Sequence, residues 1–290
     1  LNIGQPDIIT PVGFFDAVKN FDKKVLEYAG SQGMPELIEA IRKYYTTYNM
    51  DFASEDIIIT NGGSEALLFA FMAACDPGDN ILVPEPFYTN YNGFSQCLNV
   101  EVKSVTTVAD NGFHLPSKEE VQMIAEIAKE KDLWIIADEV YREFVYEGLE
   151  YTSFGNMKEV EDRVVIIDSV SKRYSACGAR IGSIACKNKQ FMAEIMKVCQ
   201  GRLCVATIEH LGAAALYDTP KSYFEEVNAE YKRRRDTLYT ELMKADGVIC
   251  EKPMGAFYIV AKLPVENAED FVAWMLKEFR RDNETVMCTT

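Results

Sequence analysis

One lysine of this chain stands where an amine could act as a nucleophile. Lys172 follows an apolar, β-branched run at residues 164–168 that predicts a buried strand, and Ser169 and Ser171 lie between the run and the lysine. A lysine at the carboxyl end of a parallel strand projects into the crevice where ligands bind. Desolvation there lowers the pKa of the amine and allows it to form a Schiff base with a carbonyl compound.

The residues after this lysine could hold a phosphate. Arg180 lies eight positions beyond Lys172, between Gly178 and Gly182. Its guanidinium can form a bidentate pair with a phosphate dianion, and the two serine hydroxyls before the lysine can add to that site. The alternative is an exposed Lys–Arg pair after a strand, with glycines that serve only as turns. The whole spaced set is far more specific than a Ser–Lys pair alone.

Residues 168–182 read Asp-Ser-Val-Ser-Lys-Arg-Tyr-Ser-Ala-Cys-Gly-Ala-Arg-Ile-Gly. This segment resembles the cofactor-lysine motif of the class I and II aminotransferases, which are fold-type-I pyridoxal-phosphate (PLP) enzymes. The resemblance extends from Asn2 to Tyr258. It implies transfer of an amino group between an amino acid and a 2-oxo acid, with the aspartate and aromatic branch as the most similar. It also implies that Lys172 binds PLP as a Schiff base and later moves a proton as general base and acid.

Under this resemblance, Asp138 and Tyr141 contact the cofactor ring. Asp138 closes a predicted apolar strand at residues 133–137. A carboxylate in that position keeps the pyridine nitrogen protonated, which makes the ring an electron sink. The matching tyrosine of the family donates a hydrogen bond to the phenolic oxygen of PLP. Taken alone, the segment is better explained as a strand end with a packing tyrosine, but its place upstream of Lys172 favours the functional interpretation.

A third segment, residues 60–66, combines a strand end, a glycine pair and a helix start. Free backbone N–H groups and the helix dipole at such a place attract anions. The resemblance implies that Gly63 and Ser64 bind the cofactor phosphate, together with Ser169 and Arg180. The alternative is an ordinary helix N-cap.

Two aromatic residues and one glycine complete the predicted pocket. Tyr88 matches the aromatic residue that stacks on the PLP ring. Tyr28 matches a tyrosine that reaches the phosphate of the neighbouring subunit, which implies a homodimer with shared active sites. Gly4 matches a backbone position near the substrate carboxylate. Without the resemblance, the two tyrosines would be interpreted as ordinary packing residues.

The elements that must position these residues form an α/β pattern. Short apolar runs alternate with helical segments, which predicts a mostly parallel sheet flanked by helices. The predicted strands are residues 57–60, 81–83, 100–105, 133–137, 164–168 and 183–186. Asp76-Pro77-Gly78-Asp79 predicts the turn that stops a helix begun near Ser64. Ser117 with Glu120 predicts a capping box for the helix through Ile127.

The pattern changes after about Gly201. Pro220 opens a polar helix to about Lys244, a strand is predicted at residues 256–261, and Asn267 caps a helix to about Phe279. We therefore expect an N-terminal arm (1–30), a large PLP-binding domain (31–203) and a smaller α+β domain (204–290).

Two parts of the family pattern are missing from the sequence. Pro116-Ser-Lys-Glu-Glu120 runs directly into Val121, where the family carries a strand and an Asn-Pro loop whose asparagine binds the phenolic oxygen of PLP. The chain also stops at Thr290, before the segment with the arginine that binds the substrate carboxylate. We expect a sheet that lacks one strand near 120/121, a truncated small domain and weak activity. The alternatives are a PLP-dependent C–S lyase or synthase on the same fold, or an inactive fragment that still binds PLP.

Composition limits the other classes of function. A formal net charge of −15 over 290 residues argues against a nucleic-acid partner. The eight cysteines form no CxxC pair, and the two histidines show no ligand spacing, so reduced thiols are expected rather than a metal site. The apolar runs are too short to span a bilayer, and the opening residues lack both Met and a signal-peptide pattern. We therefore expect a cytoplasmic protein whose N-terminus has been cut.

Overall fold

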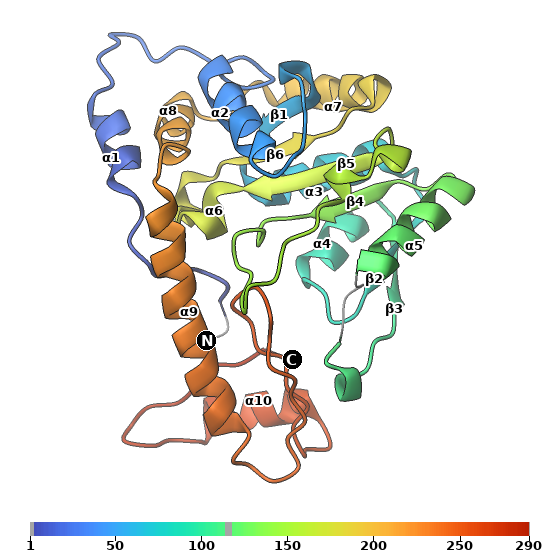
Figure 1. Ribbon diagram of the computed structural model, residues 1–290, viewed down its shortest axis with the longest axis vertical. Helices are drawn as coiled ribbons and strands as arrows, with labels where there is room; N and C mark the ends of the chain where they lie inside the picture. Colours follow the sequence, from blue (N-terminus) through green and yellow to red (C-terminus); the bar gives the residue numbers. More distant parts are fainter. Residues whose placement is uncertain (1–2, 114–117, 290) are drawn as a thin grey trace.

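The computed structural model describes residues 3–113 and 118–289. A four-stranded sheet forms its centre, and helices cover both faces of the sheet (Figure 1). In order across the sheet, the strands are β1 (Ile57–Thr60), β6 (Gly182–Ala185), β5 (Val164–Ser169) and β4 (Ile135–Asp138). β4 and β5 are parallel, whereas β6 runs antiparallel to both of its neighbours. The carboxyl ends of β1, β5 and β4 therefore lie at one edge of the sheet.

A second sheet contains two parallel strands, β2 (Asn80–Pro84) and β3 (Glu101–Val105). Helix α4 (Asn90–Cys97) lies between them in sequence and packs against β3. Within the described ranges, no strand pairs with the outer side of β4 or joins it to β2. All six strands predicted for this part of the chain are present. The family strand that the sequence is expected to lack, near 120/121, would fall between β3 and β4 in sequence.

The larger sheet is buried on both faces because its strands carry branched apolar residues at consecutive positions. Ile57 and Ile59 of β1 enter one apolar cluster, and Ile58 enters the other. β5 alternates in the same way, with Ile166 on the first side and Ile167 on the second. Side chains of a strand point alternately to opposite faces, so each strand contributes to both clusters.

Helices complete the two layers around the sheet. The first cluster includes residues of α2 (Pro35–Thr46), α5 (Lys118–Glu130) and α8 (Thr207–Leu216). The second includes residues of α3 (Gly62–Ala74) and α7 (Lys189–Arg202). Helix α1 (Val12–Lys19) packs against α8. The long α9 (Lys221–Leu242) leads away from the sheet to the part of the molecule that holds α10 (Ala268–Lys277) (Figure 1).

Several helix ends follow the predicted signals. The backbone N–H of Asp76 donates to the Asp79 carboxylate (2.8 Å) in the turn after α3. The side chain of Asn267 accepts hydrogen bonds from two backbone N–H groups in the first turn of α10. Pro220 directly precedes α9. The predicted capping box involves Ser117, which lies outside the described residues. In the described parts of the chain, no helix has the length and apolar character needed to cross a membrane.

The predicted strand at residues 256–261 is wrong. Only isolated bridges occur in this region, between Val145 and Gly255 and between Ile249 and Lys262. Ala256 has a φ of +53°, which interrupts an extended conformation. The ring of Phe257 packs against the rings of neighbouring aromatic residues instead of serving a strand ladder. An apolar run here therefore reflects aromatic packing, which local periodicity does not distinguish from a strand.

Candidate active site

The residues with predicted chemistry gather where the parallel strands end. Asp138 is the last residue of β4, and Ser169 is the last residue of β5. Thr60 ends β1 and is followed by the glycine pair that starts α3. The register aligns Thr60 with Gly182, and Gly182 with Ser169. The topology thus brings segments more than 100 residues apart in sequence to one edge of the sheet.

Lys172 lies in a short helix, α6 (Val170–Arg173), directly after β5. The hydroxyl of Ser169 accepts from the N–H of Ser171 and so caps this helix (3.0 Å). Lys172 Nζ donates to the backbone carbonyl of Gly4. Burial lowers the pKa of the Lys172 amine, and it outweighs the nearby Cys177 and Asp138, which act in the opposite direction. A lysine in this setting gains nucleophilic neutral amine at a lower pH than an exposed lysine.

Asp138 is half-buried at the end of β4 and has a phenol as its partner. Tyr91 Oη, from α4, donates to Asp138 Oδ2 at 2.9 Å. Burial raises the pKa of the Asp138 carboxyl, and Asp168 and Glu139 raise it further, while the Tyr91 hydrogen bond lowers it. A positive charge beside Asp138 would favour the ionised form of this carboxyl.

Tyr141 and Tyr258 form a phenol pair beside Lys172. Their hydroxyl oxygens are within hydrogen-bonding distance, and the two rings meet edge to face at 5.4 Å and 76°. Lys172 Nζ lies 5.9 Å from the centre of the Tyr141 ring. A Cβ at Gly4 would lie 2.1 Å from Tyr258 Oη and 3.5 Å from Lys172 Nζ. The backbone of Gly4 therefore approaches the lysine and the phenol pair as only a glycine can.

The start of α3 forms a cradle under a guanidinium. Gly62 has a φ of +76°, and a Cβ there would lie 2.3 Å from Arg180 Nη2. A Cβ at Gly182 would lie 2.4 Å from the backbone carbon of Gly62. Two glycines thus let β6, α3 and Arg180 approach one another closely. Arg180 itself donates to the carbonyl of Cys177 (3.0 Å) and remains exposed.

Gly63, Ser64 and Ser169 lie around the same cradle. A Cβ at Gly63 would lie 3.8 Å from the Cβ of Ser169, so the helix start and the end of β5 are adjacent. Ser64 is half-buried in the first turn of α3. Ser169 Oγ lies 2.7 Å from Ser171 Oγ and 3.1 Å from the carbonyl of Ile181. Its single proton must leave these partners before it can donate to a ligand.

The two remaining predicted tyrosines are in different settings. The ring of Tyr88 meets the ring of Tyr91 edge to face at 5.6 Å, and Asn90 donates to its hydroxyl (2.6 Å). Tyr88 also contributes to the raised pKa of Tyr141 and of Tyr258, as expected of a neighbouring phenol. Tyr28, by contrast, is 81% exposed within a single chain. One chain therefore brings Tyr88 to the site but does not bury Tyr28.

Sequence reasoning missed two residues of this site. It named Tyr258 only as the end of a similar segment and did not consider Tyr91. Tyr91 lies three residues after Tyr88, just inside α4, whereas Tyr88 precedes that helix. That closeness to Tyr88 in sequence was the available signal, but only the tertiary structure shows that Asp138 is the partner of Tyr91.

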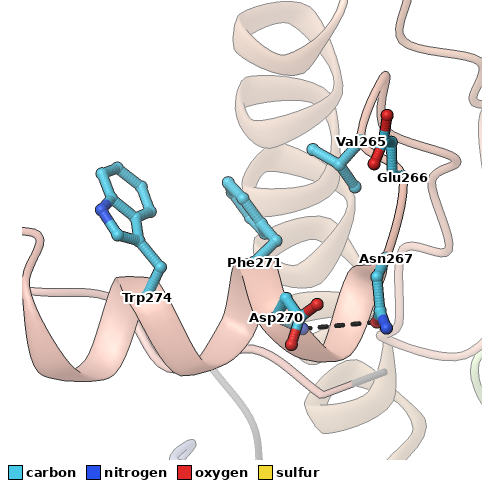
Figure 2. A pocket seen from close by; sticks show the side chains of 6 residues that line it. All are labelled: Val265, Glu266, Asn267, Asp270, Phe271 and Trp274. Atoms are coloured by element: carbon cyan, nitrogen blue, oxygen red, sulfur yellow. Dashed lines mark hydrogen bonds between the residues drawn. The ribbon is translucent and has the colours of Figure 1, made fainter.

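A surface cavity of about 430 Å³ lies elsewhere, at the start of α10 (Figure 2). It is lined by Val265, Glu266, Asn267, Asp270, Phe271 and Trp274. None of the predicted site residues is among them. The cavity is therefore separate from the lysine site.

Comparison with known proteins places the chain in a family. The family model described as "Aminotransferase class I and II" matches residues 16–116 and 114–281. A "probable aspartate aminotransferase" from Methanocaldococcus jannaschii is 31% identical over 295 aligned positions, which cover 89% of this chain and 76% of that protein. The solved alanine aminotransferase of Pyrococcus furiosus is 29% identical and superposes with a TM-score of 0.88, over 94% of this chain and 80% of that one.

A third relative, the second with a known structure, is the aromatic aminotransferase of Pyrococcus horikoshii. It is 25% identical, with a TM-score of 0.89 over 96% of this chain and 83% of that chain. The three relatives are named for different amino acids, and all three are named as aminotransferases. Both the family match and the identity to the first relative extend over most of the sequence. The chain therefore belongs to the class I and II aminotransferases, which are PLP-dependent transaminases.

Proposed function

We propose that this aminotransferase exchanges the amino group of an aspartate-type or aromatic amino acid with a 2-oxo acid, and that Lys172 is its PLP-binding lysine. The supporting observation is the arrangement of Lys172, Asp138 and Arg180 at one sheet edge. These three residues provide an amine, a carboxylate and a guanidinium, which are the groups that a phosphorylated pyridine aldehyde requires. The relatives named for aspartate and aromatic amino acids support this class of substrate.

The residues present fit PLP. Lys172 has a lowered pKa and would bind the aldehyde carbon. The cradle between Gly62 and Arg180 would take the phosphate, because the start of α3 and the guanidinium both favour an anion. Gly63, Ser64 and Ser169 would border that phosphate. Asp138 would hold the ring nitrogen, Tyr141 the phenolic oxygen and Tyr88 the face of the ring.

Several residues of the chain would each have a separate role in catalysis. When bound, PLP withdraws electrons from the substrate Cα. Asp138 provides the negative charge that keeps the ring nitrogen protonated. Lys172 Nζ, once freed by the substrate amine, would take the proton from the substrate Cα and deliver it to the C4′ carbon of the cofactor. The backbone of Gly4, which touches Lys172 Nζ, would lie beside the substrate carboxylate.

The first experiment is borohydride reduction of the PLP-loaded chain, followed by peptide mapping. Reduction fixes the pyridoxyl group on the lysine that binds it, and we expect the label on Lys172. Lys187 is a suitable internal control, because it is half-buried and ion-paired with Glu161 at 2.8 Å, away from the site. A label on another lysine, with none on Lys172, would contradict the assignment.

The products, and whether they require a 2-oxo acid, distinguish the transaminase from the lyase alternative. A transaminase produces a new amino acid only when a 2-oxo acid is added, whereas a C–S lyase releases pyruvate and ammonia without one. We expect amino transfer that depends on the 2-oxo acid. Release of ammonia without an acceptor would favour the lyase.

A homodimer is the proposed working unit. The N-terminal part of the chain exposes many apolar side chains, which would be unfavourable in water unless a second copy covers them. They are Ile3, Ile9, Val12, Val25, Leu26 and Tyr28. A two-fold dimer is the most common oligomer.

The eight cysteines are free thiols, which supports a reducing compartment such as the cytoplasm.

We also propose that one strand of the family sheet is missing from the interior of this chain. The two sheets of the described residues are separate, and the family match divides into two stretches that meet at residues 114–116. The alignment to the Methanocaldococcus relative has 295 positions, more than the 290 residues of the chain, so that relative carries residues without a counterpart here.

A further inference from the structure

Four charged side chains are buried together behind the candidate active site. Glu139, Arg142, Asp168 and Arg173 have exposed fractions of 5%, 2%, 1% and 1%. Two are acids and two are bases, so their formal charges cancel. Charged residues are rarely buried this completely unless they are paired.

These four residues form one continuous chain of ion pairs. Arg142 pairs through Nη2 with Glu139 (2.6 Å) and through Nη1 with Asp168 (2.9 Å). Asp168 is in turn paired with Arg173. Ser153 Oγ lies 2.7 Å from one oxygen of Glu139 and 3.0 Å from the other. Each acid therefore has a hydrogen-bond donor, and Asp168 links the two arginines.

Aromatic rings enclose the two guanidinium groups. The Arg173 guanidinium carbon lies 4.1 Å from the centre of the Tyr44 ring. The Arg142 guanidinium carbon lies 5.2–5.7 Å from four rings, those of Tyr44, Tyr45, Tyr48 and Tyr151. Aromatic faces attract cations and exclude water, which holds the guanidinium groups in place.

Each of the four charged residues is the immediate neighbour in sequence of a proposed PLP contact. The neighbouring pairs are Asp138 with Glu139, Tyr141 with Arg142, Asp168 with Ser169, and Lys172 with Arg173. The first two pairs lie at the end of β4 and in the turn that follows it, and the last two lie at the end of β5 and in α6. The ion pair between Arg142 and Asp168 therefore ties the turn after β4 to the end of β5.

Stability alone is a poor explanation for this network. Removing four charges from water is costly, and well-packed apolar residues often replace buried ion pairs without loss of stability. What apolar packing does not provide is a fixed direction, whereas the forked guanidinium bonds its partners in one geometry.

We propose that Glu139, Arg142, Asp168 and Arg173 are positioning residues, which fix the turns carrying Asp138, Tyr141, Ser169 and Lys172 in the geometry that binds PLP. This inference rests on the proposed assignment of those residues to PLP. The four charged side chains pair with one another, so they would act on the PLP contacts mainly through the backbone of the two turns.

The test compares Arg142→Met, Arg142→Lys and the double variant Glu139→Gln with Arg142→Met in the full 290-residue chain. The double variant keeps one acid paired with one base, so it remains foldable if the single variant does not. Two quantities are measured: amide hydrogen exchange of residues 138–142 and 168–173 without cofactor, and the dissociation constant of PLP. Loss of a residue that orients the ligands of a metal site typically costs about 10–100-fold in affinity, and we expect a loss of similar size in PLP affinity for both Met variants. Lysine keeps the charge without the fork and should recover part of the affinity.

Arg235→Met is the matched control. Arg235 is 6% exposed, pairs with Glu147 and Asp236, and lies 4.8 Å from the centre of the Tyr146 ring, but it is not next to any proposed PLP contact. At an equal loss of thermal stability, the control should leave the PLP dissociation constant and the exchange of both segments nearly unchanged.

The outcomes separate this inference from the proposed function. If the double variant binds PLP like the parent chain and exchanges its amides at the parent rate, the positioning role is refuted. If the borohydride label is absent from Lys172 in the parent chain, the PLP assignment fails, and with it the purpose proposed for the network. Faster exchange in both segments with weaker PLP binding, set against the Arg235 control, supports the inference.

Discussion

Asp138 shows how a single residue depends on what it is expected to bind. Burial raises the pKa of its carboxyl, as do the neighbouring carboxylates Asp168 and Glu139, while hydrogen bonds from Tyr91 and one backbone N–H lower it. A protonated pyridine ring would add a positive charge beside it. The environment is therefore unfavourable for a free carboxylate and suitable for one that holds a pyridinium.

Replacing Asp138 by alanine should lower turnover much more than it lowers bound PLP. The carboxylate mainly stabilises charge that develops during the reaction, and the loss of such a group typically costs about 100–1000-fold in rate. Phosphate and lysine contacts remain, so much of the cofactor affinity should persist. Turnover and PLP content are measured side by side, with Asp132→Ala as a control, because the Asp132 side chain is 93% exposed. An unchanged rate would rule out this role for Asp138.

Gly62→Ala should weaken PLP binding by displacing Arg180. The new Cβ would lie 2.3 Å from the guanidinium, and the φ of +76° is strained for alanine. Loss of a charge-assisted hydrogen bond costs about 1.5–3 kcal/mol, or about tenfold or more in affinity. Gly201→Ala is the control, because that helical position has open space around it and should become about 0.5–1 kcal/mol more stable. Equal PLP affinity in both variants would count against a phosphate cradle at Gly62.

At the scale of elements, the strand that carries Asp138 lies at the edge of the larger sheet in the described part of the chain. β4 carries Asp138 but has β5 as its one strand neighbour in the described part of the chain. β2 and β3 stand as a separate pair, with Leu82 and Val105 exposed at 62% and 48%. Unpaired strand edges and exposed apolar residues are unfavourable in water and promote association.

Inserting a strand and Asn-Pro loop from a complete relative at position 120/121 should join the two sheets. Each new interstrand hydrogen bond adds about 1 kcal/mol net, so a strand as long as β4 should add about 2–4 kcal/mol of stability. PLP affinity and transamination should both rise, because Asp138 would no longer lie on an edge strand. Thermal unfolding, PLP binding and rate are measured against an insertion of the same length made of Gly and Ser. Full activity of the original chain, at about 1–1000 turnovers per second, would show that nothing essential is missing.

At the scale of the whole molecule, a single chain leaves several apolar side chains of the N-terminal segment exposed to water. Gly4 reaches the site in the same chain, since its carbonyl accepts from Lys172. Tyr28 does not, and it lies among exposed apolar neighbours. A second copy would both cover these side chains and place Tyr28 at a phosphate site.

Two variants that each weaken PLP binding should therefore rescue each other. In a mixture of Tyr28→Phe and Lys172→Ala chains, a mixed dimer has one site with an intact lysine from the first chain and an intact tyrosine from the second. We expect PLP binding in the mixture to exceed that of either variant alone, and sedimentation to show dimers. A functional monomer, or a mixture with no gain over its components, would refute shared sites.

The sequence by itself determined the family motif, the strands and the order of the predicted site residues. Residues 164–182 carry a strand, a lysine and an arginine at fixed spacing, and the structure contains the strand where it was predicted. Local periodicity was sufficient because β5 is buried along its whole length and its branched residues do not fit another element. It was insufficient at residues 256–261, where aromatic side chains pack without a strand.

Only the tertiary structure decided which groups meet. The pairing of Tyr91 with Asp138, the contact of Tyr258 with Tyr141, and the ion pair of Arg142 with Asp168 all join residues that are far apart in the sequence. Contacts of this kind depend on how strands and helices pack, and one sequence carries no direct record of that packing. The chemistry of each residue type can therefore be read along the chain, whereas the partner that adjusts that chemistry is set by the fold.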